Sequence, residues 1–295
     1  MDGVLNINKP PHMTSHDVVL CVRRILKEKR IGHTGTLDPM ATGVLVLCTG
    51  NATRIARYLE AGEKEYRATM RLGVTTDTLD AEGSIIETRA YTPPSDEKLL
   101  ESFRLFTGPI MQRPPAYSAV KIAGVPSYKL AREGKAEPLA PRPVSILAIE
   151  MTSHEEPLIG LAVTCSKGVY IRTLCADIGE ALGMGAHLTS LVRTRSGRFS
   201  IDCGVTLDEL AGLAAAGRAE QVFTSMDEAL SDFPAVLLSE SDTTRVRHGN
   251  PVSCPADLLN RGFDRVRLHG STGTLLAVAR ENAGILKPET VFAHE

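Results

Sequence analysis

The chain has 295 residues, of which 43% are hydrophobic and 23% are charged, with a formal net charge of −2 at pH 7. The length predicts a sizeable core in one large domain plus a small one, or in two moderate domains. No apolar run approaches the roughly 18 residues that span a bilayer, and no signal-peptide pattern precedes residue 12, so we expect a cytoplasmic protein without a membrane partner. The six scattered cysteines contain no Cys-x-x-Cys pair, which favours reduced thiols over a zinc site.

Positive charge is concentrated in two segments despite the slightly negative total. Residues 21–36 hold five lysines and arginines against one glutamate, and residues 111–142 hold six against two glutamates. A solvated surface produces the same pattern, but two basic segments also suit a polyanionic partner such as a nucleic acid.

Hydrophobic spacing predicts mixed helices and strands in the first 165 residues. Thr14 and Ser15 are suitable caps for an amphipathic helix that ends before Gly32, and Asn51 is a suitable cap for a helix through Leu59. Residues 93–106 predict a third helix, and residues 108–143, rich in proline, glycine and basic residues, predict an irregular excursion. Strands are predicted at residues 44–48, 66–72, 144–151 and 158–165.

The remaining chain predicts a helix at residues 171–182, a helix and linker at 206–232, and short strands separated by glycines at 233–295. Strands and helices mix without regular β-α-β alternation, which favours an α+β fold with a mixed, largely antiparallel central sheet. We expect one domain over residues 1–232, with an insertion at 109–143, and a small β-rich domain over residues 233–295.

Residues 32–43 place Asp38 in a glycine-bounded loop before an apolar strand; they read Gly-His-Thr-Gly-Thr-Leu-Asp-Pro-Met-Ala-Thr-Gly. The glycines permit backbone angles and close approaches that a side chain blocks, and Pro39 restricts Asp38 to an extended or turn conformation. Such a loop can aim a carboxylate at a ligand. Asp-Pro is also a common turn pair, so the residues alone leave both readings open.

The loop resembles the catalytic motif of the TruB family, the bacterial synthases that make pseudouridine at position 55 of tRNA. Every fixed position of the family pattern G-H-x-G-x-L-D-P-x-A-x-G is present. The resemblance continues in order, within residues 3 to about 200, through separate blocks at residues 3–15, 64–66, 76–83, 112–121, 166–174 and 188–197.

The resemblance implies roles for ten residues. It makes Asp38 the catalytic carboxylate, Tyr66 the residue that stacks on the base and takes part in the final proton removal, and Arg172 the partner that holds Asp38 ionised. An adjacent cation lowers a carboxylate pKa by roughly 1 to 3 units, which we expect to offset burial. Substrate contacts are expected from His33, which fills the space of the displaced base, and from Tyr170, Leu191, Lys9, Lys121, Arg132 and Arg193.

The resemblance also implies a pseudouridine synthase fold, a thumb-like RNA clamp at residues 109–143 and a PUA-like RNA-binding module at the C-terminus. Isomerisation of uridine transfers nothing to a second molecule, so no cofactor or metal is expected. The expected substrate is the T-arm stem-loop of tRNA, bound by a monomer without an obligatory protein partner.

Three other functions are compatible with parts of the sequence. Basic segments suit a tRNA-folding chaperone, and guide-RNA-dependent pseudouridine synthases share the Asp38 loop. Asp77 and Asp80 suggest a metal-dependent hydrolase, but companion ligands at hard-cation spacing are missing, which favours a hydrogen-bonded turn.

Overall fold

The computed structural model describes residues 1–122, 124–135, 137–256, 258 and 262–292. Positions 123 and 136 of the predicted insertion lie outside the described residues, as do positions 257, 259–261 and 293–295 of the predicted C-terminal domain.

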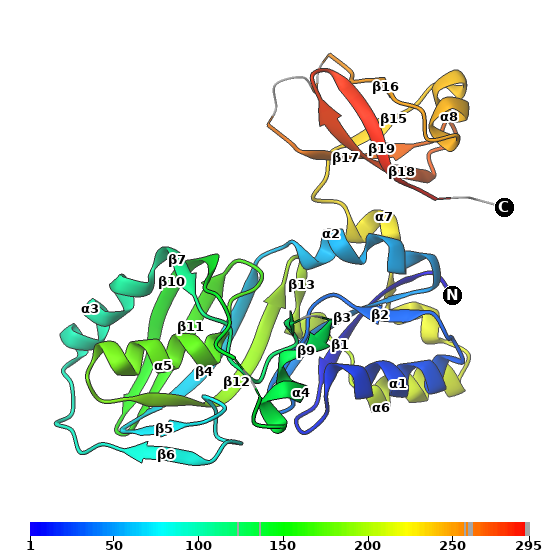
Figure 1. Cartoon of the computed structure of the whole chain (residues 1–295). Helices are drawn as coiled ribbons and strands as arrows, with labels where there is room; N and C mark the ends of the chain where they lie inside the picture. The colour runs from blue at the N-terminus through cyan, green and yellow to red at the C-terminus, as the bar shows by residue number, and fades with distance from the viewer. Residues whose placement is uncertain (123, 136, 257, 259–261, 293–295) are drawn as a thin grey trace.

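A ten-stranded sheet forms the body of the molecule (Figure 1). All of its neighbours are antiparallel except β3 and β12, which confirms the predicted α+β class with a largely antiparallel central sheet. The main path of the sheet is β14 (Phe223–Thr224), β1 (Gly3–Lys9), β3 (Thr42–Thr49), β12 (Ala186–Ser196), β4 (Lys64–Leu72), β11 (Leu158–Cys165), β10 (Arg142–Glu155) and β7 (Gly108–Gln112), with β2 (Ile31–His33) beside β3 and β13 (Phe199–Ser200) beside β12.

Two small hairpins and several helices complete the larger part of the chain. The hairpins are β5 (Val74–Thr76) with β6 (Ile85–Thr88), and β8 (Lys121–Ile122) with β9 (Val125–Pro126). The helices are α1 (Ser15–Leu26), α2 (Ala56–Glu60), α3 (Asp96–Phe106), α4 (Ser127–Arg132), α5 (Ile171–Ala181), α6 (Leu207–Ala215) and α7 (Met226–Ala229), with 3₁₀ helices at Gly50–Ile55, Ile201–Cys203 and Ala219–Val222.

Local sequence explains where the main elements begin. The Thr14 hydroxyl accepts from the Asp17 backbone N–H while the Asp17 carboxylate accepts from the Thr14 N–H, a capping box that starts α1 at the predicted place. The strand predicted at residues 66–72 is β4, which begins two residues earlier and alternates buried and less buried side chains as a one-sided strand does. Leu5, Leu47, Met70 and Leu161 join one core between this sheet and its helices.

Three local predictions were wrong. Asn51 does not cap a helix; it lies inside a 3₁₀ helix, where its side-chain amide donates to Asp2 at 2.6 Å. The segment predicted as irregular begins with β7 and later holds β8, β9 and α4, so the excursion from the sheet is confined to residues 113–141. The predicted linker near residue 224 returns to the large sheet as β14, which pairs with β1.

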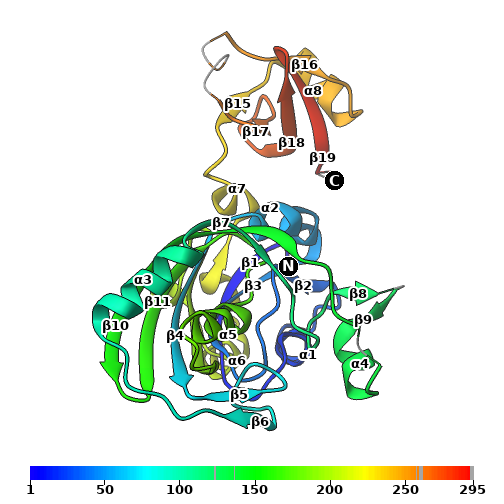
Figure 2. The same cartoon turned by 60° about the vertical axis from the view of Figure 1, so that its left-hand side comes forward.

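A second, smaller sheet follows residue 234. It has the order β15 (Ala235–Leu237), β17 (Arg265–His269), β18 (Leu275–Asn282), β19 (Ile285–Val291) and β16 (Val252–Ser253), and it carries α8 (Glu240–Arg247), a helix that the sequence did not predict. In both views the small sheet lies above α2 and α7 (Figures 1 and 2). Leu275, Val278 and Phe292 pack with Ile55 and Tyr58 in one apolar cluster, so the two sheets share buried surface.

Candidate active site

The loop that carries Asp38 connects β2 to β3 and is held in place by buried polar groups. The Lys9 ammonium is fully buried and donates to the carbonyls of Pro10, Met13 and Pro39, the last at 3.0 Å. The Ser15 hydroxyl accepts from the Leu37 N–H at 2.8 Å and lies 3.1 Å from the Leu37 carbonyl. These bonds attach the residues on both sides of Asp38 to the start of the chain, which fixes the direction of the carboxylate.

Two of the three loop glycines are required by geometry. Gly43 has φ +95°, and a Cβ there would lie 2.3 Å from the backbone oxygen of Arg193 on the neighbouring strand. Gly35 has φ +133°, a conformation that side chains rarely allow. Gly32 lies in β2 with open space around it, so the expectation that all three glycines serve the loop conformation is wrong for this one.

Arg172 is the cationic partner of Asp38. It lies in the first turn of α5, its side chain is 4% exposed, and its Nε approaches Asp38 Oδ2 at 2.8 Å while Nη2 donates to Oδ1 at 3.1 Å. The Asp38 side chain keeps 31% of its surface exposed. One edge of the carboxylate is therefore held by the guanidinium, and the group remains open to a ligand.

Arg172 is itself fixed by groups that sequence reasoning did not connect with it. Nη1 donates to the Thr78 carbonyl at 2.8 Å and pairs with Asp80 at 3.3 Å, and Nη2 donates to the Tyr117 carbonyl at 2.9 Å. The sequence did hold a signal for these contacts, because the blocks at residues 76–83 and 112–121 both resemble family motifs. These contacts leave the guanidinium little freedom to leave Asp38.

The pKa of Asp38 is raised above its ordinary value, mainly because the surrounding protein removes water from the carboxylate. Arg172 and Lys9 oppose this rise, and the charge of Asp80 adds to it. This direction differs from the sequence-based expectation that Arg172 would offset the effect of burial on the Asp38 pKa. A carboxylate with a raised pKa is more basic once it is ionised, which favours bond formation or proton abstraction.

Aromatic and apolar residues of the predicted base pocket lie on elements next to this pair. Tyr66 lies on β4 and is 9% exposed. Leu191 lies on β12 opposite Ala68 of β4, and all three residues belong to one apolar core. Tyr170 precedes α5; its backbone N–H donates to Gln112 at 2.7 Å, and its carbonyl accepts from the Gln112 amide. Burial raises the pKa of both tyrosines, so both hydroxyls keep their protons at neutral pH.

Other predicted contact residues fall into two groups. His33 is on β2, where burial lowers its pKa and favours the neutral ring. Lys121 and Arg132 are exposed on the excursion, with the Arg132 guanidinium 5.6 Å from the centre of the Tyr128 ring. Figure 2 shows this part, β8, β9 and α4, projecting from the body.

Lys9 and Arg193 do not have the surroundings expected of substrate contacts. Lys9 is 0% exposed and Arg193 is 2% exposed. The Arg193 guanidinium donates to the carbonyls of Val44 and Gly35, and the Lys9 ammonium donates to three carbonyls. Because their charged groups bind backbone carbonyls inside the protein, both residues support the Asp38 loop and do not reach the surface where a phosphate would bind.

The acidic block at residues 76–83 forms a hydrogen-bonded turn. Asp77 accepts from the Ser84 N–H at 2.8 Å, and Asp80 accepts from the Thr78 hydroxyl at 2.6 Å. Over the ranges that the structure describes, no group of three or more His, Cys, Asp and Glu side chains is arranged to hold a metal ion.

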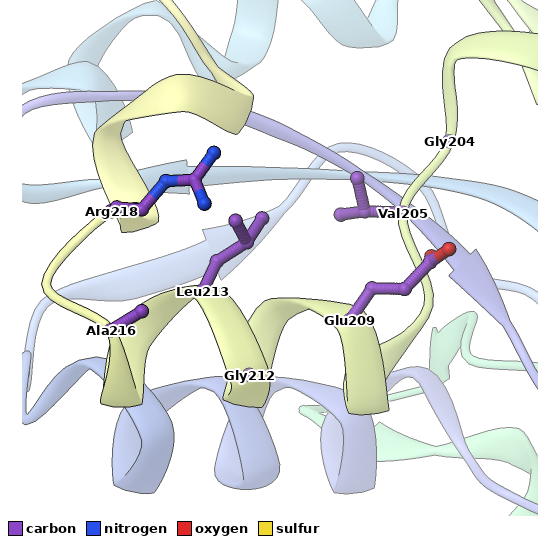
Figure 3. Close-up of a pocket in the computed structure, with 7 residues that line it drawn as sticks. All are labelled: Gly204, Val205, Glu209, Gly212, Leu213, Ala216 and Arg218. Atoms are coloured by element: carbon purple, nitrogen blue, oxygen red, sulfur yellow. The ribbon is translucent and has the colours of Figure 1, made fainter.

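A surface hollow lies beside α6 (Figure 3). It is lined by Gly204, Val205, Glu209, Gly212, Leu213, Ala216 and Arg218. None of these residues belongs to the predicted site. In the described part of the chain, no helix has the length and apolar character to cross a membrane.

Known proteins resemble the chain over nearly its whole length. A family model described as TruB family pseudouridylate synthase (N terminal domain) matches residues 23–171, and one described as tRNA pseudouridylate synthase B C-terminal domain matches residues 172–233. A tRNA pseudouridine synthase B of Burkholderia lata is 44% identical over 292 residues, which cover 98% of this chain and 89% of the relative. That of Geotalea uraniireducens is 42% identical and covers 95% of this chain and 92% of the relative.

Solved structures agree with this relationship. A Cbf5-Nop10-Gar1 complex contains a chain with a TM-score of 0.76 and 30% identity, covering 99% of this chain and 85% of that one. An H/ACA RNP bound to a substrate RNA with 2′-deoxyuridine gives a TM-score of 0.74 at 27% identity, again over 99% of this chain and 85% of that one.

The fold and the site therefore define a pseudouridine synthase, an isomerase. More particularly, the chain belongs to the TruB family.

Proposed function

We propose that this enzyme isomerises uridine 55 in the T-arm loop of tRNA to pseudouridine, with Asp38 as the catalytic carboxylate. The observation that carries the proposal is the ion pair of Asp38 and Arg172 at 2.8 Å, in a loop anchored on both sides. The choice of tRNA is supported by the names of relatives at 42–44% identity, and the position within tRNA by the family resemblance.

The target uridine has to leave its stack before its glycosidic bond is accessible, at a cost of a few kcal/mol. Tyr66 and Tyr170 offer aromatic surfaces that recover part of this cost by stacking on the extruded base. Leu191 contributes an apolar wall, and neutral His33 fills the space that the base leaves. These side chains would give a flipped uracil aromatic and apolar walls.

The reaction breaks the bond from N1 to C1′ and forms the bond from C5 to C1′. Ionised Asp38 acts at the ribose or at the base, and attack at C1′ is the variant with precedent in carboxylate nucleophiles. After the uracil rotates, C5 bonds to C1′ and, where Asp38 has attacked that carbon, displaces the carboxylate; C5 then loses its proton and N1 gains one, so no net charge or redox equivalent remains. Tyr66 takes part in this transfer: its hydroxyl passes its own proton toward N1 while its oxygen receives the proton from C5.

Asp38→Asn tests this assignment most directly. We expect it to keep tRNA affinity and to abolish release of tritium from tRNA labelled at uridine C5, because the amide is nearly isosteric but not nucleophilic. Asp208→Asn makes the same chemical change on the exposed start of α6 and should release tritium at the wild-type rate. Substantial turnover by Asp38→Asn contradicts the assignment; release of no tritium by the wild-type protein favours an RNA chaperone.

We further propose that the enzyme works as a monomer without a guide RNA or a protein partner. The excursion at residues 113–141 and the small β sheet after residue 234, which we treat as a PUA-like domain, then supply the RNA contacts outside the active site. The purified chain alone should modify a tRNA transcript at uridine 55. Activity that appears only after a guide RNA is added would assign the chain to the guide-dependent type.

A further inference from the structure

Among the residues that the structure describes, three cations on β1, β4 and β12 are buried with no carboxylate within ion-pair distance. Lys9, Lys64 and Arg193 are 0%, 4% and 2% exposed. Their charged groups donate hydrogen bonds to backbone carbonyls. Burial of an unpaired charge is costly, so a retained buried cation calls for a reason.

The three cations differ in how they can relieve this cost. Burial lowers the pKa of both Lys9 and Lys64 to about 8, so either lysine can lose its proton at modest cost. An arginine guanidinium does not deprotonate in proteins. Arg193 is therefore the fixed positive charge of this group.

Arg193 bridges the two ends of the loop that carries Asp38. Its Nε donates to the carbonyl of Val44, just after the loop, at 2.7 Å, and its Nη2 donates to the carbonyl of Gly35, before Asp38, at 3.2 Å. The Arg193 backbone lies against Gly43, where no Cβ fits. Main chain and side chain of one residue thus set the separation of the loop ends.

Arg193 also faces Tyr66 across the sheet. The two residues are direct partners in the antiparallel pairing of β12 and β4, so their side chains lie on the same face. Burial raises the pKa of the Tyr66 hydroxyl, and the Arg193 guanidinium opposes that rise. A fixed positive charge at this place favours any step in which negative charge develops on the Tyr66 oxygen.

We propose that Arg193 is a positioning residue with two effects: its guanidinium clamps the ends of the Asp38 loop, and its charge assists removal of the C5 proton through Tyr66. The clamp places the carboxylate for the step at the ribose or the base. The charge acts later, when the proton leaves C5 of the rebonded base. The inference rests on the proposed function, because Tyr66 has that role only in uridine isomerisation.

Single-turnover kinetics with tRNA transcribed from ordinary or C5-deuterated uridine triphosphate separate the two effects. Arg193→Gln keeps donors for the carbonyls but removes the charge; we expect a rate about 10²-fold lower, the scale for loss of one preorganised electrostatic group. We also expect a deuterium isotope effect clearly larger than that of the wild type, because C5–H cleavage becomes rate-limiting. Arg193→Lys keeps the charge but not the planar fork, so it should be slower with an isotope effect like that of the wild type.

Arg195→Gln is the matched control, because Arg195 lies two residues further along β12 with its side chain 32% exposed and its charge paired with Glu65 at 2.7 Å. It should leave the isotope effect unchanged. A wild-type isotope effect in a folded Arg193→Gln variant overturns the charge role, and an unaltered rate in both Arg193 variants overturns the clamp. If circular dichroism shows Arg193→Gln to be unfolded, an enlarged isotope effect in Arg193→Lys also overturns the charge role. Absence of pseudouridine formation by the wild-type enzyme would instead remove the proposed function itself.

Discussion

The loop around Asp38 and the excursion at residues 113–141 use positive charge in opposite ways. Beneath the loop, Lys9 and Arg193 are buried and satisfied by backbone carbonyls, whereas Lys121 and Arg132 on the excursion are exposed. Buried charges hold a geometry that has to be accurate within fractions of an ångström for catalysis. Exposed charges instead attract a polyanion over a distance set by salt. The contrast predicts separate effects on rate and on affinity.

The largest effect is expected for Arg172→Lys. Lysine keeps the charge beside Asp38 but cannot reproduce the fork that also contacts Thr78, Tyr117 and Asp80. We predict a single-turnover rate about 10² to 10³-fold lower, with little change in KM for tRNA.

Arg89→Lys is the matched control, because Arg89 pairs with Glu87 and Glu180 at the surface and touches none of the Asp38 partners. Its rate should match the wild type. If Arg172→Lys raised KM and left the rate intact, the buried cation would be serving affinity, and the contrast between the two regions would fail.

A smaller effect, on affinity, is predicted for the double variant Lys121→Ala with Arg132→Ala. We expect a higher KM for tRNA at an unchanged single-turnover rate, and a slope of log K against log salt that is reduced by about 1 to 2, because each phosphate contact contributes about 0.7 to 0.9 to the slope.

The charge-matched control is Lys98→Ala with Arg218→Ala, two exposed residues outside both basic segments. It removes the same charge and should leave the slope as it is. Equal slopes for the two double variants would mean that net charge, and not the excursion, sets the affinity.

The sequence predicted what depends on local pattern. Thr14, one of the two residues that the sequence offered as a cap, caps α1, and the alternation predicted from Tyr66 became β4. The resemblance to a family placed Arg172 at Asp38, 134 residues away along the chain. Hydrophobic periodicity alone gives no such pair, because it reports which face of an element is buried and not which elements meet.

Burial of charge was the main feature that the sequence did not predict. Lys9 and Arg193 look like solvated or phosphate-binding residues in a linear chain, and only the close approach of β1, β3 and β12 shows that they lie inside. Strands as short as β14, with two residues, are also too short to show alternation. Both failures concern tertiary contacts, which explains why the support of Asp38 was less predictable than Asp38 itself.

The smallest effect is expected for a charge cluster at the surface, far along the sheet from Asp38. Because these charges hold no buried loop, we expect them to contribute little to the stability of the fold. His154 lies 2.6 Å from Asp96 at the start of α3 and 3.1 Å from Glu156, and hydrogen bonds to these carboxylates raise its pKa above the ordinary 6.5. The folded protein therefore favours the protonated ring. The stabilisation that the ring contributes is complete below pH 6.5 and is lost as pH rises through the pKa of the folded state.

His154→Gln should lower the free energy of unfolding more at about pH 5.5 than at about pH 8.5, with a difference below about 1 kcal/mol. Urea denaturation at both values checks this, with His248→Gln at the exposed end of α8 as the control. A loss that is equal at the two pH values would show that packing of the ring, and not its charge, joins α3 to β10.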